Sequence, residues 1–153
     1  MTSALTDEQR AAADRWFAIE CNNRGWDLVE RAERSAAETE EMVIAASTAA
    51  YHWRRVGTPL NVARADMLLA LALAFAGAPQ ASEVAARQLA FYDEAGCEDW
   101  ERALAHAAVA AAARASGDDA RFGEQLGLAR AARNRVESDD ERGIVDATLS
   151  KLG

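Results

Sequence analysis

ADMLLALALAFAGAPQASEVAARQLAFYDEAG, residues 65–96, is the stretch that decides the fold. An apolar run reaches Ala76, Gly77 and Pro79 interrupt it, and an amphipathic run follows as far as Gly96. Forty positions after Gly77, Gly117 separates a second pair of runs in the same way. Each helical hairpin of this kind can bury its apolar face only by stacking on a neighbour, so the repetition indicates an α-solenoid.

The composition supports an all-α domain. The chain has 153 residues, a length that suits one domain with an unaided core, and half of its residues are hydrophobic. Alanine is the commonest of these, and it favours helix over glycine by about 1 kcal/mol at each position. No segment alternates apolar and polar β-branched residues with a period of two, so we expect no sheet.

Capping patterns divide the chain into helices. Thr6 with Gln9, Ser35 with Glu38 and Ser138 with Glu141 are typical of helix starts, because each side chain can bond to the other residue's backbone. A glycine at position 57, expected in a left-handed cap, ends one helix before Thr58 and Pro59 start the next. The predicted helices of this single domain, residues 1–153, cover 7–33, 36–56, 59–76, 80–95, 98–116, 119–136 and 139–152.

One position leaves the first of these helices open to a second interpretation. Gly25 lies inside it and costs up to about 1 kcal/mol relative to alanine. A continuous helix is favoured, and a break at Gly25 is the competing possibility.

Two motifs resemble a known family. Ala74-Phe75-Ala76-Gly77 and Ala115-Ser116-Gly117-Asp118 are similar to the turns of tetratricopeptide (TPR) repeats. The order Tyr51-His52-Trp53, Val56-Gly57-Thr58-Pro59, Asn61, Ala63 and Arg64 resembles an uncharacterised bacterial family of TPR-like proteins over most of the chain. The resemblance implies an α-α superhelix of about seven antiparallel helices, and it implies no activity.

Charge and hydropathy restrict the partners. The formal net charge is −8, and Lys151 is the only lysine, so we expect no nucleic acid, whose binding needs clustered basic residues. The most apolar stretch, Met67 to Ala76, is shorter than the roughly 20 residues of a membrane-spanning helix, so we expect no membrane partner. The N-terminus does not resemble a signal peptide, and a cytoplasmic location is expected.

One cluster carries groups suited to a ligand, at the corner between the second and third predicted helices. An imidazole and a guanidinium there would hold a small acidic ligand. The structural alternative is that Trp53 separates two helices, Asn61 caps one, and Arg64 pairs with Asp66 or Glu20. The residues of this cluster are Tyr51, His52, Trp53, Asn61 and Arg64.

Two further tryptophans are candidates for partner binding. Trp16 and Trp26 are predicted to share one stripe of the first helix, where they would line a concave groove or a dimer contact, because tryptophan is favoured at binding hot spots. Core packing is the alternative for each. The two histidines, His52 and His106, have no ligand spacing typical of a metal site, so neither a metal nor a cofactor is predicted.

No catalytic motif occurs, so the sequence favours a non-enzymatic helical-repeat scaffold that binds a protein or peptide, or another copy of itself. The alternative is a small-molecule sensor or minor enzyme with its site at His52 and Arg64. A structural homo-oligomer packed through alanine-rich helices is a third possibility.

Overall fold

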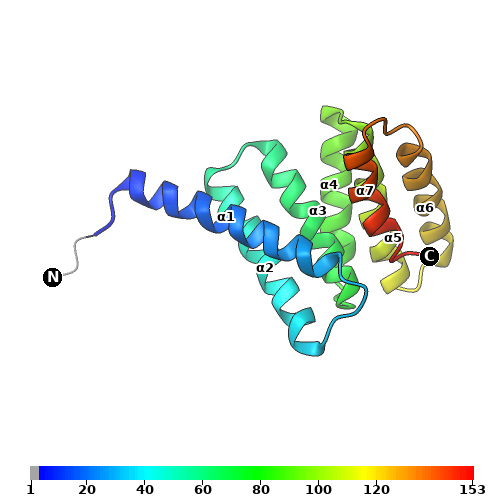
Figure 1. Ribbon diagram of the computed structural model, residues 1–153, viewed down its shortest axis with the longest axis horizontal. Coiled ribbons are helices and arrows are strands. Elements are labelled where there is room, and N and C mark those ends of the chain that lie inside the picture. The colour runs from blue at the N-terminus through cyan, green and yellow to red at the C-terminus, as the bar shows by residue number, and fades with distance from the viewer. Residues whose placement is uncertain (1–3) are drawn as a thin grey trace.

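The computed structural model describes residues 4–153, which form seven α-helices and no strand, so the predicted all-α fold is confirmed (Figure 1). Every helix lies inside its predicted range, and the differences are at the ends. The helices are α1 (Asp7–Val29), α2 (Ala36–Val56), α3 (Pro59–Phe75), α4 (Ala81–Ala95), α5 (Asp99–Ala115), α6 (Asp119–Arg133) and α7 (Asp139–Leu149).

Side-chain caps set most of the helix starts. The capping boxes predicted at Thr6 and Ser35 are both complete, and Ser138 accepts a hydrogen bond from the backbone of Glu141. Sequence reasoning missed the contact at the start of α5, where the Glu101 side chain accepts from the N–H of Glu98 at 3.1 Å. These bonds satisfy backbone donors that a helix start leaves without partners.

Glycines end α3, α4 and α5 with positive φ angles, 71° at Gly77, 75° at Gly96 and 80° at Gly117. Such angles strain any residue with a Cβ. The prediction of a left-handed cap at Gly57 was wrong, because its backbone is extended, with φ −88°. Glycine is required there for space, since a Cβ would lie 2.6 Å from the carbonyl oxygen of Trp53.

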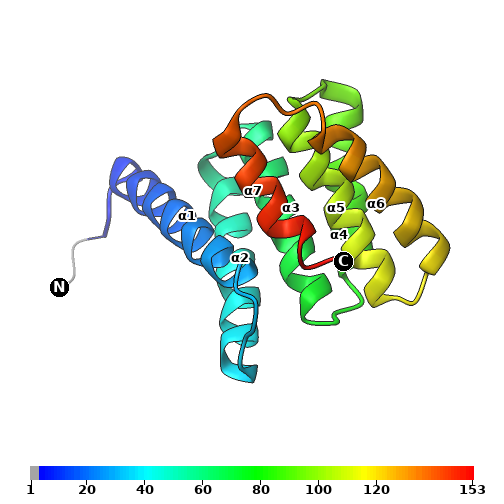
Figure 2. The same cartoon turned by 45° about the vertical axis from the view of Figure 1, so that its right-hand side comes forward.

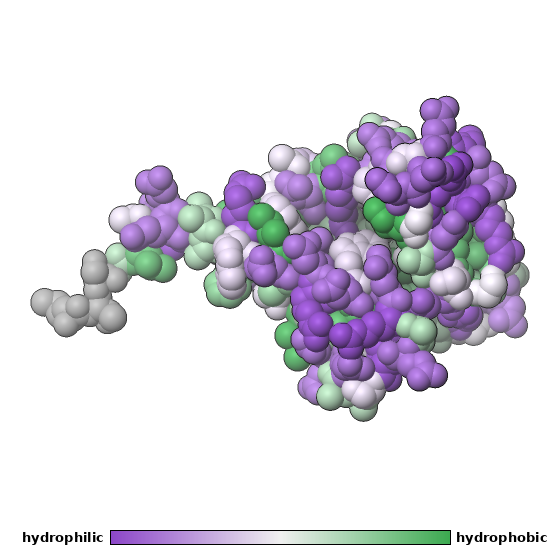
Figure 3. Space-filling model, viewed as in Figure 1, coloured by the Kyte–Doolittle hydropathy of each residue, from purple (hydrophilic) through white to green (hydrophobic). Residues whose placement is uncertain are grey.

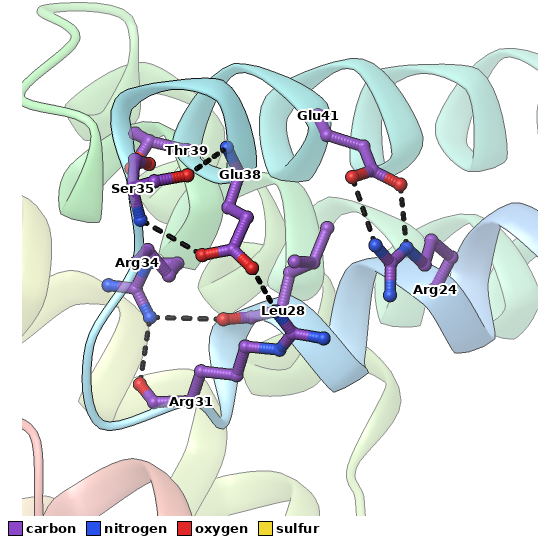
Figure 4. A network of polar contacts seen from close by, with 8 residues as sticks. All are labelled: Arg24, Leu28, Arg31, Arg34, Ser35, Glu38, Thr39 and Glu41. Carbon is purple, nitrogen blue, oxygen red and sulfur yellow. Dashed lines mark hydrogen bonds and ion pairs between the residues drawn. The ribbon is translucent and has the colours of Figure 1, made fainter.

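The first helix is continuous through Gly25 but ends at Val29, four residues before the predicted end. Arg34 in the following loop donates to the carbonyl oxygens of Leu28 and Arg31, each at 3.0 Å (Figure 4). It also donates to the carbonyl oxygen of Val29 at 3.2 Å. The side chain thus takes the place of the next helical turn in satisfying these acceptors.

Consecutive helices pack against each other, and α3 also contacts α1 and α5. Its buried stretch Met67–Ala72 forms the centre of the core. Figures 1 and 2 show α1 and α2 at one end of the molecule and α6 at the other, with α7 lying across α5. No helix within residues 4–153 is long and apolar enough to cross a membrane.

Candidate functional site

A pocket of about 440 Å³ lies between the odd-numbered helices. We call it the tryptophan pocket, because three indole side chains line it. Figure 3 shows the molecule from the side where α1 and α7 face the viewer, with a hollow between them. The lining residues are Asn22, Trp26 and Glu30 from α1, Trp53 from α2, Asn61, Arg64 and Met67 from α3, Trp100 and Leu104 from α5, and Ile144 from α7.

The three indoles are held by packing on the core. Trp53 packs against the cluster around Leu68, Trp100 packs against the one around Leu104, and Trp26 contacts both clusters. Gly25 makes the position of Trp26 possible, because a Cβ on Gly25 would lie 2.8 Å from Cδ2 of Leu68. The missing side chain lets α1 approach α3 closely and places the next residue at the pocket.

Arg64 is the only basic residue that lines the pocket within the described part of the chain, and its charge is balanced. Its Nε and Nη2 lie 2.8 and 2.7 Å from Oε1 of Glu101, and its guanidinium carbon lies 5.1 Å from the ring centroid of Trp100. Glu101 is only 3% exposed. The predicted pairing of Arg64 with Asp66 or Glu20 was wrong. The packing of α3 on α5 brings the Glu101 carboxylate to the Arg64 guanidinium instead.

Asp66, the acid adjacent in sequence, binds other arginines. It accepts hydrogen bonds from Arg54 of α2 and Arg87 of α4, and its side chain is almost fully buried. The bonds join three helices around one carboxylate, which is a structural role.

Asn61 caps α3 and also lines the tryptophan pocket. Its Oδ1 accepts from the N–H of Thr58 at 3.0 Å, and Thr58 in turn accepts from the N–H of Asn61, so the pair caps α3. The same residue lines the tryptophan pocket, where the cap holds it in place.

Trp16, Tyr51 and His52 lie elsewhere, in a group that we call the aromatic patch, Trp16, Phe17, Tyr51 and His52. The rings of Phe17 and His52 stack at 5.3 Å between centroids, and Trp16 and Tyr51 meet them edge-on at 4.9 and 5.1 Å. Trp16 and Tyr51 are each 58% exposed. The predicted corner is therefore split, with Trp53, Asn61 and Arg64 at the pocket and Tyr51 and His52 at the patch.

The predicted common stripe of Trp16 and Trp26 was wrong. Ten residues of α-helix leave two side chains about 80° apart around the axis, because each residue turns the helix by about 100°. Trp16 points to the aromatic patch and Trp26 to the tryptophan pocket.

A buried carboxylate supports the aromatic patch. His52 Nδ1 lies 2.7 Å from Oδ1 of Asp14, and Arg55 Nε donates to Oδ2 at 2.9 Å. The hydrogen bond from His52, followed by that from Arg55, lowers the pKa of Asp14 below its usual value. His52 and Arg64 therefore bind different carboxylates, Asp14 and Glu101, in separate places.

Sequence reasoning missed several pocket residues, Asn22, Glu30, Met67, Trp100, Leu104 and Ile144. A signal existed in the repeated hairpins. Alternate helices of such a stack lie side by side, so the first turns of the third and fifth predicted helices are expected to be neighbours. That reasoning would have placed Trp100 beside Asn61 and Arg64.

Within residues 4–153, no three His, Cys, Asp or Glu side chains form a group suited to a metal ion. His106, the second histidine, bonds through Nδ1 to Oε1 of Gln125 at 2.8 Å. Comparison with known proteins gives no match to this chain, whether with family models, with curated proteins or with solved structures.

Proposed function

We propose that this protein is a non-enzymatic helical-repeat module that binds a segment of a partner protein by holding one basic side chain in the tryptophan pocket. The convergence of three indoles from three helices on one volume of about 440 Å³ carries this proposal. Aromatic side chains with a few fixed polar groups are typical of binding pockets and of interface hot spots.

The position of the pocket supports a repeat architecture of the TPR-like kind. Helices α1, α3, α5 and α7 all contribute to it, which is how stacked hairpins form a concave binding surface. A partner segment lying across these helices would place one side chain between the indoles.

The charge of the pocket favours a basic side chain. Arg64 is neutralised by Glu101, whereas Glu30 is exposed at the pocket and has no basic group within 4.0 Å among residues 4–153. Indole faces attract ammonium and guanidinium groups, and the net charge of −8 would attract a basic segment over longer distances.

Peptide display is the experiment that tests the proposal. Peptides that bind the wild-type protein are selected from a random library. Calorimetry then measures their affinity for the wild type and for Trp53→Ala and Glu30→Gln. We expect a shared lysine or arginine and weaker binding to both variants. Trp16→Ala is the matched control, because Trp16 is a tryptophan of the same chain that does not line the pocket. Recovered peptides that bind Trp53→Ala as tightly as wild type, with its folding checked by circular dichroism, would refute the proposal.

Self-association is a second candidate, favoured by the exposure of Trp16, Phe17 and Tyr51 at 58%, 43% and 58%. Contiguous exposed aromatic side chains are typical of protein contacts, and a two-fold dimer would bury the same patch on both copies. Light scattering should then show a dimer that Tyr51→Ala converts to a monomer, and a wild-type monomer at high concentration would exclude this candidate.

A further inference from the structure

A second pocket lies toward the other end of the same alternate helices. Its volume is about 750 Å³, and it includes Ala74 of α3 and Ala111 of α5. These residues are seven positions beyond Met67 and Leu104 of the tryptophan pocket, which corresponds to about 10 Å along each helix. The lining residues are Ala32, Arg34, Ala74, Phe75, Ala111, Arg114, Ala115, Ser150 and Lys151.

Three basic side chains line this second pocket, and no carboxylate does. The three include Lys151, the only lysine of a chain whose net charge is −8. We call Arg34, Arg114 and Lys151 the basic cluster.

The basic cluster differs from most other cations of the protein in having no carboxylate partner. Eleven arginines lie within 4.0 Å of a carboxylate oxygen. In the part of the chain that the structure describes, Arg34, Arg114 and Lys151 have no such partner. Their positive charges are therefore not cancelled by ion pairs.

Backbone carbonyls hold the two arginines in place. Arg34 donates through Nη1 to the carbonyls at the end of α1, and its guanidinium lies 5.3 Å from the ring centroid of Phe75. The other terminal nitrogen of Arg34 makes no dashed contact with the residues drawn in Figure 4. Arg114 donates to the carbonyls of Lys151 and Leu152 at 2.9 and 3.2 Å. A carbonyl is neutral, so these bonds orient the guanidinium groups and leave their charge in the pocket.

The negative ends of helix dipoles oppose the positive charge of the basic cluster. Four helices, α1, α3, α5 and α7, end near this pocket, and each end carries about half a negative charge, which together amounts to about −2 against three full positive charges. Positive charge therefore prevails. Burial lowers the pKa of Arg34, which indicates that its charge is partly desolvated and would gain from an anion.

We propose that the basic cluster binds the phosphate or pyrophosphate group of a small molecule, with Phe75 and the alanine side chains contacting the rest of that molecule. Three cations match the charge of a multiply ionised phosphate better than that of a carboxylate. This site shares no residue with the tryptophan pocket, so it does not depend on the peptide-binding function.

The single lysine allows a sharp test with inorganic pyrophosphate as the probe. Acetylation by an amine-reactive ester has two targets in this chain, Lys151 and the terminal amino group, and mass spectrometry measures both rates in one sample. We expect pyrophosphate at constant ionic strength to slow acetylation of Lys151 while the rate at the terminal amine is unchanged. Sodium acetate at the same ionic strength should have little effect.

Calorimetry on variants completes the test. Lys151→Gln and Arg114→Gln should each weaken pyrophosphate binding at least about fivefold, because each removes a charge-assisted contact. Arg121→Gln is the matched control, since Arg121 also lacks a carboxylate within 4.0 Å in the described chain but lies outside this pocket. Unprotected Lys151 at millimolar pyrophosphate would overturn the proposal, and so would equal weakening by Arg121→Gln and Lys151→Gln.

Discussion

Gly25→Ala tests whether α1 contacts α3 as closely as the structure shows. Alanine at an interior helix position is favoured over glycine by about 1 kcal/mol, so the helix alone would be stabilised. The added Cβ would lie 2.8 Å from Cδ2 of Leu68, whereas carbon atoms normally approach to about 3.5–4.0 Å. Leu68 is fully buried and has little room to move.

Overpacking of a core typically costs about 1–3 kcal/mol, so its middle value of about 2 kcal/mol exceeds the helix gain. We expect Gly25→Ala to lower the free energy of unfolding by about 1 kcal/mol, which corresponds to about 2–4 °C in Tm for a chain of this size. Thermal and urea unfolding, followed by circular dichroism, measure both quantities.

Two further variants isolate the contact. Gly127→Ala on α6 is the matched control, because nothing lies within 4 Å of its added Cβ, and it should stabilise the protein by up to about 1 kcal/mol. Leu68→Val removes the δ-methyl groups, so Gly25→Ala in that background should become neutral or stabilising. If Gly25→Ala raises Tm as Gly127→Ala does, or if Leu68→Val leaves its effect unchanged, the close approach of α1 to α3 is wrong.

Three other predictions concern buried or half-buried groups. The hydroxyl of Tyr92 is buried without a hydrogen-bond partner among the described residues, so Tyr92→Phe should leave the free energy of unfolding unchanged or raise it by up to about 1 kcal/mol, as urea unfolding will measure. His52 and Arg55 lower the pKa of Asp14 below its unfolded value of 3.8, so their contacts stabilise the fold fully above that pH and lose this effect as the pH falls through the lower folded pKa. Urea unfolding from about pH 5 to pH 2 should therefore show a smaller loss of unfolding free energy for Asp14→Asn than for wild type. Burial raises the pKa of the Cys21 and Cys97 thiols, so iodoacetamide at about pH 8 should alkylate both more slowly in the folded protein than in urea.

The helices could be predicted because their signals are local. Capping residues, apolar periodicity and the glycines at 77, 96 and 117 act within a few positions of the chain. The predicted end of α1 lay four residues too far along the chain, because Arg34 in the loop binds the last carbonyl groups of the helix. The contact between Glu98 and Glu101 was missed because glutamate is not among the preferred N-cap residues.

The candidate site was predicted only in part, because side-chain partners depend on how helices stack. Trp53, Asn61 and Arg64 were identified from their proximity in sequence, and all three line the pocket. Trp100 and Glu101 come from α5, about 40 residues later, so they reach Arg64 only through the packing of α5 on α3. Conversely, His52 is adjacent to Trp53 in sequence but faces Asp14.

The two pockets should act independently, although both are built on α3 and α5. Between them, Ala70 and Leu71 of α3 and Ala107 and Ala108 of α5 are fully buried, so packed core closes the space that separates the pockets. Effects at sites about 10 Å apart without shared partners usually add to within about 0.5 kcal/mol. Glu30→Gln should therefore leave pyrophosphate affinity unchanged, and Lys151→Gln should leave peptide affinity unchanged. In the double variant, calorimetry should show each single loss at its original size, whereas a larger loss would mean that α3 and α5 shift when either pocket is filled.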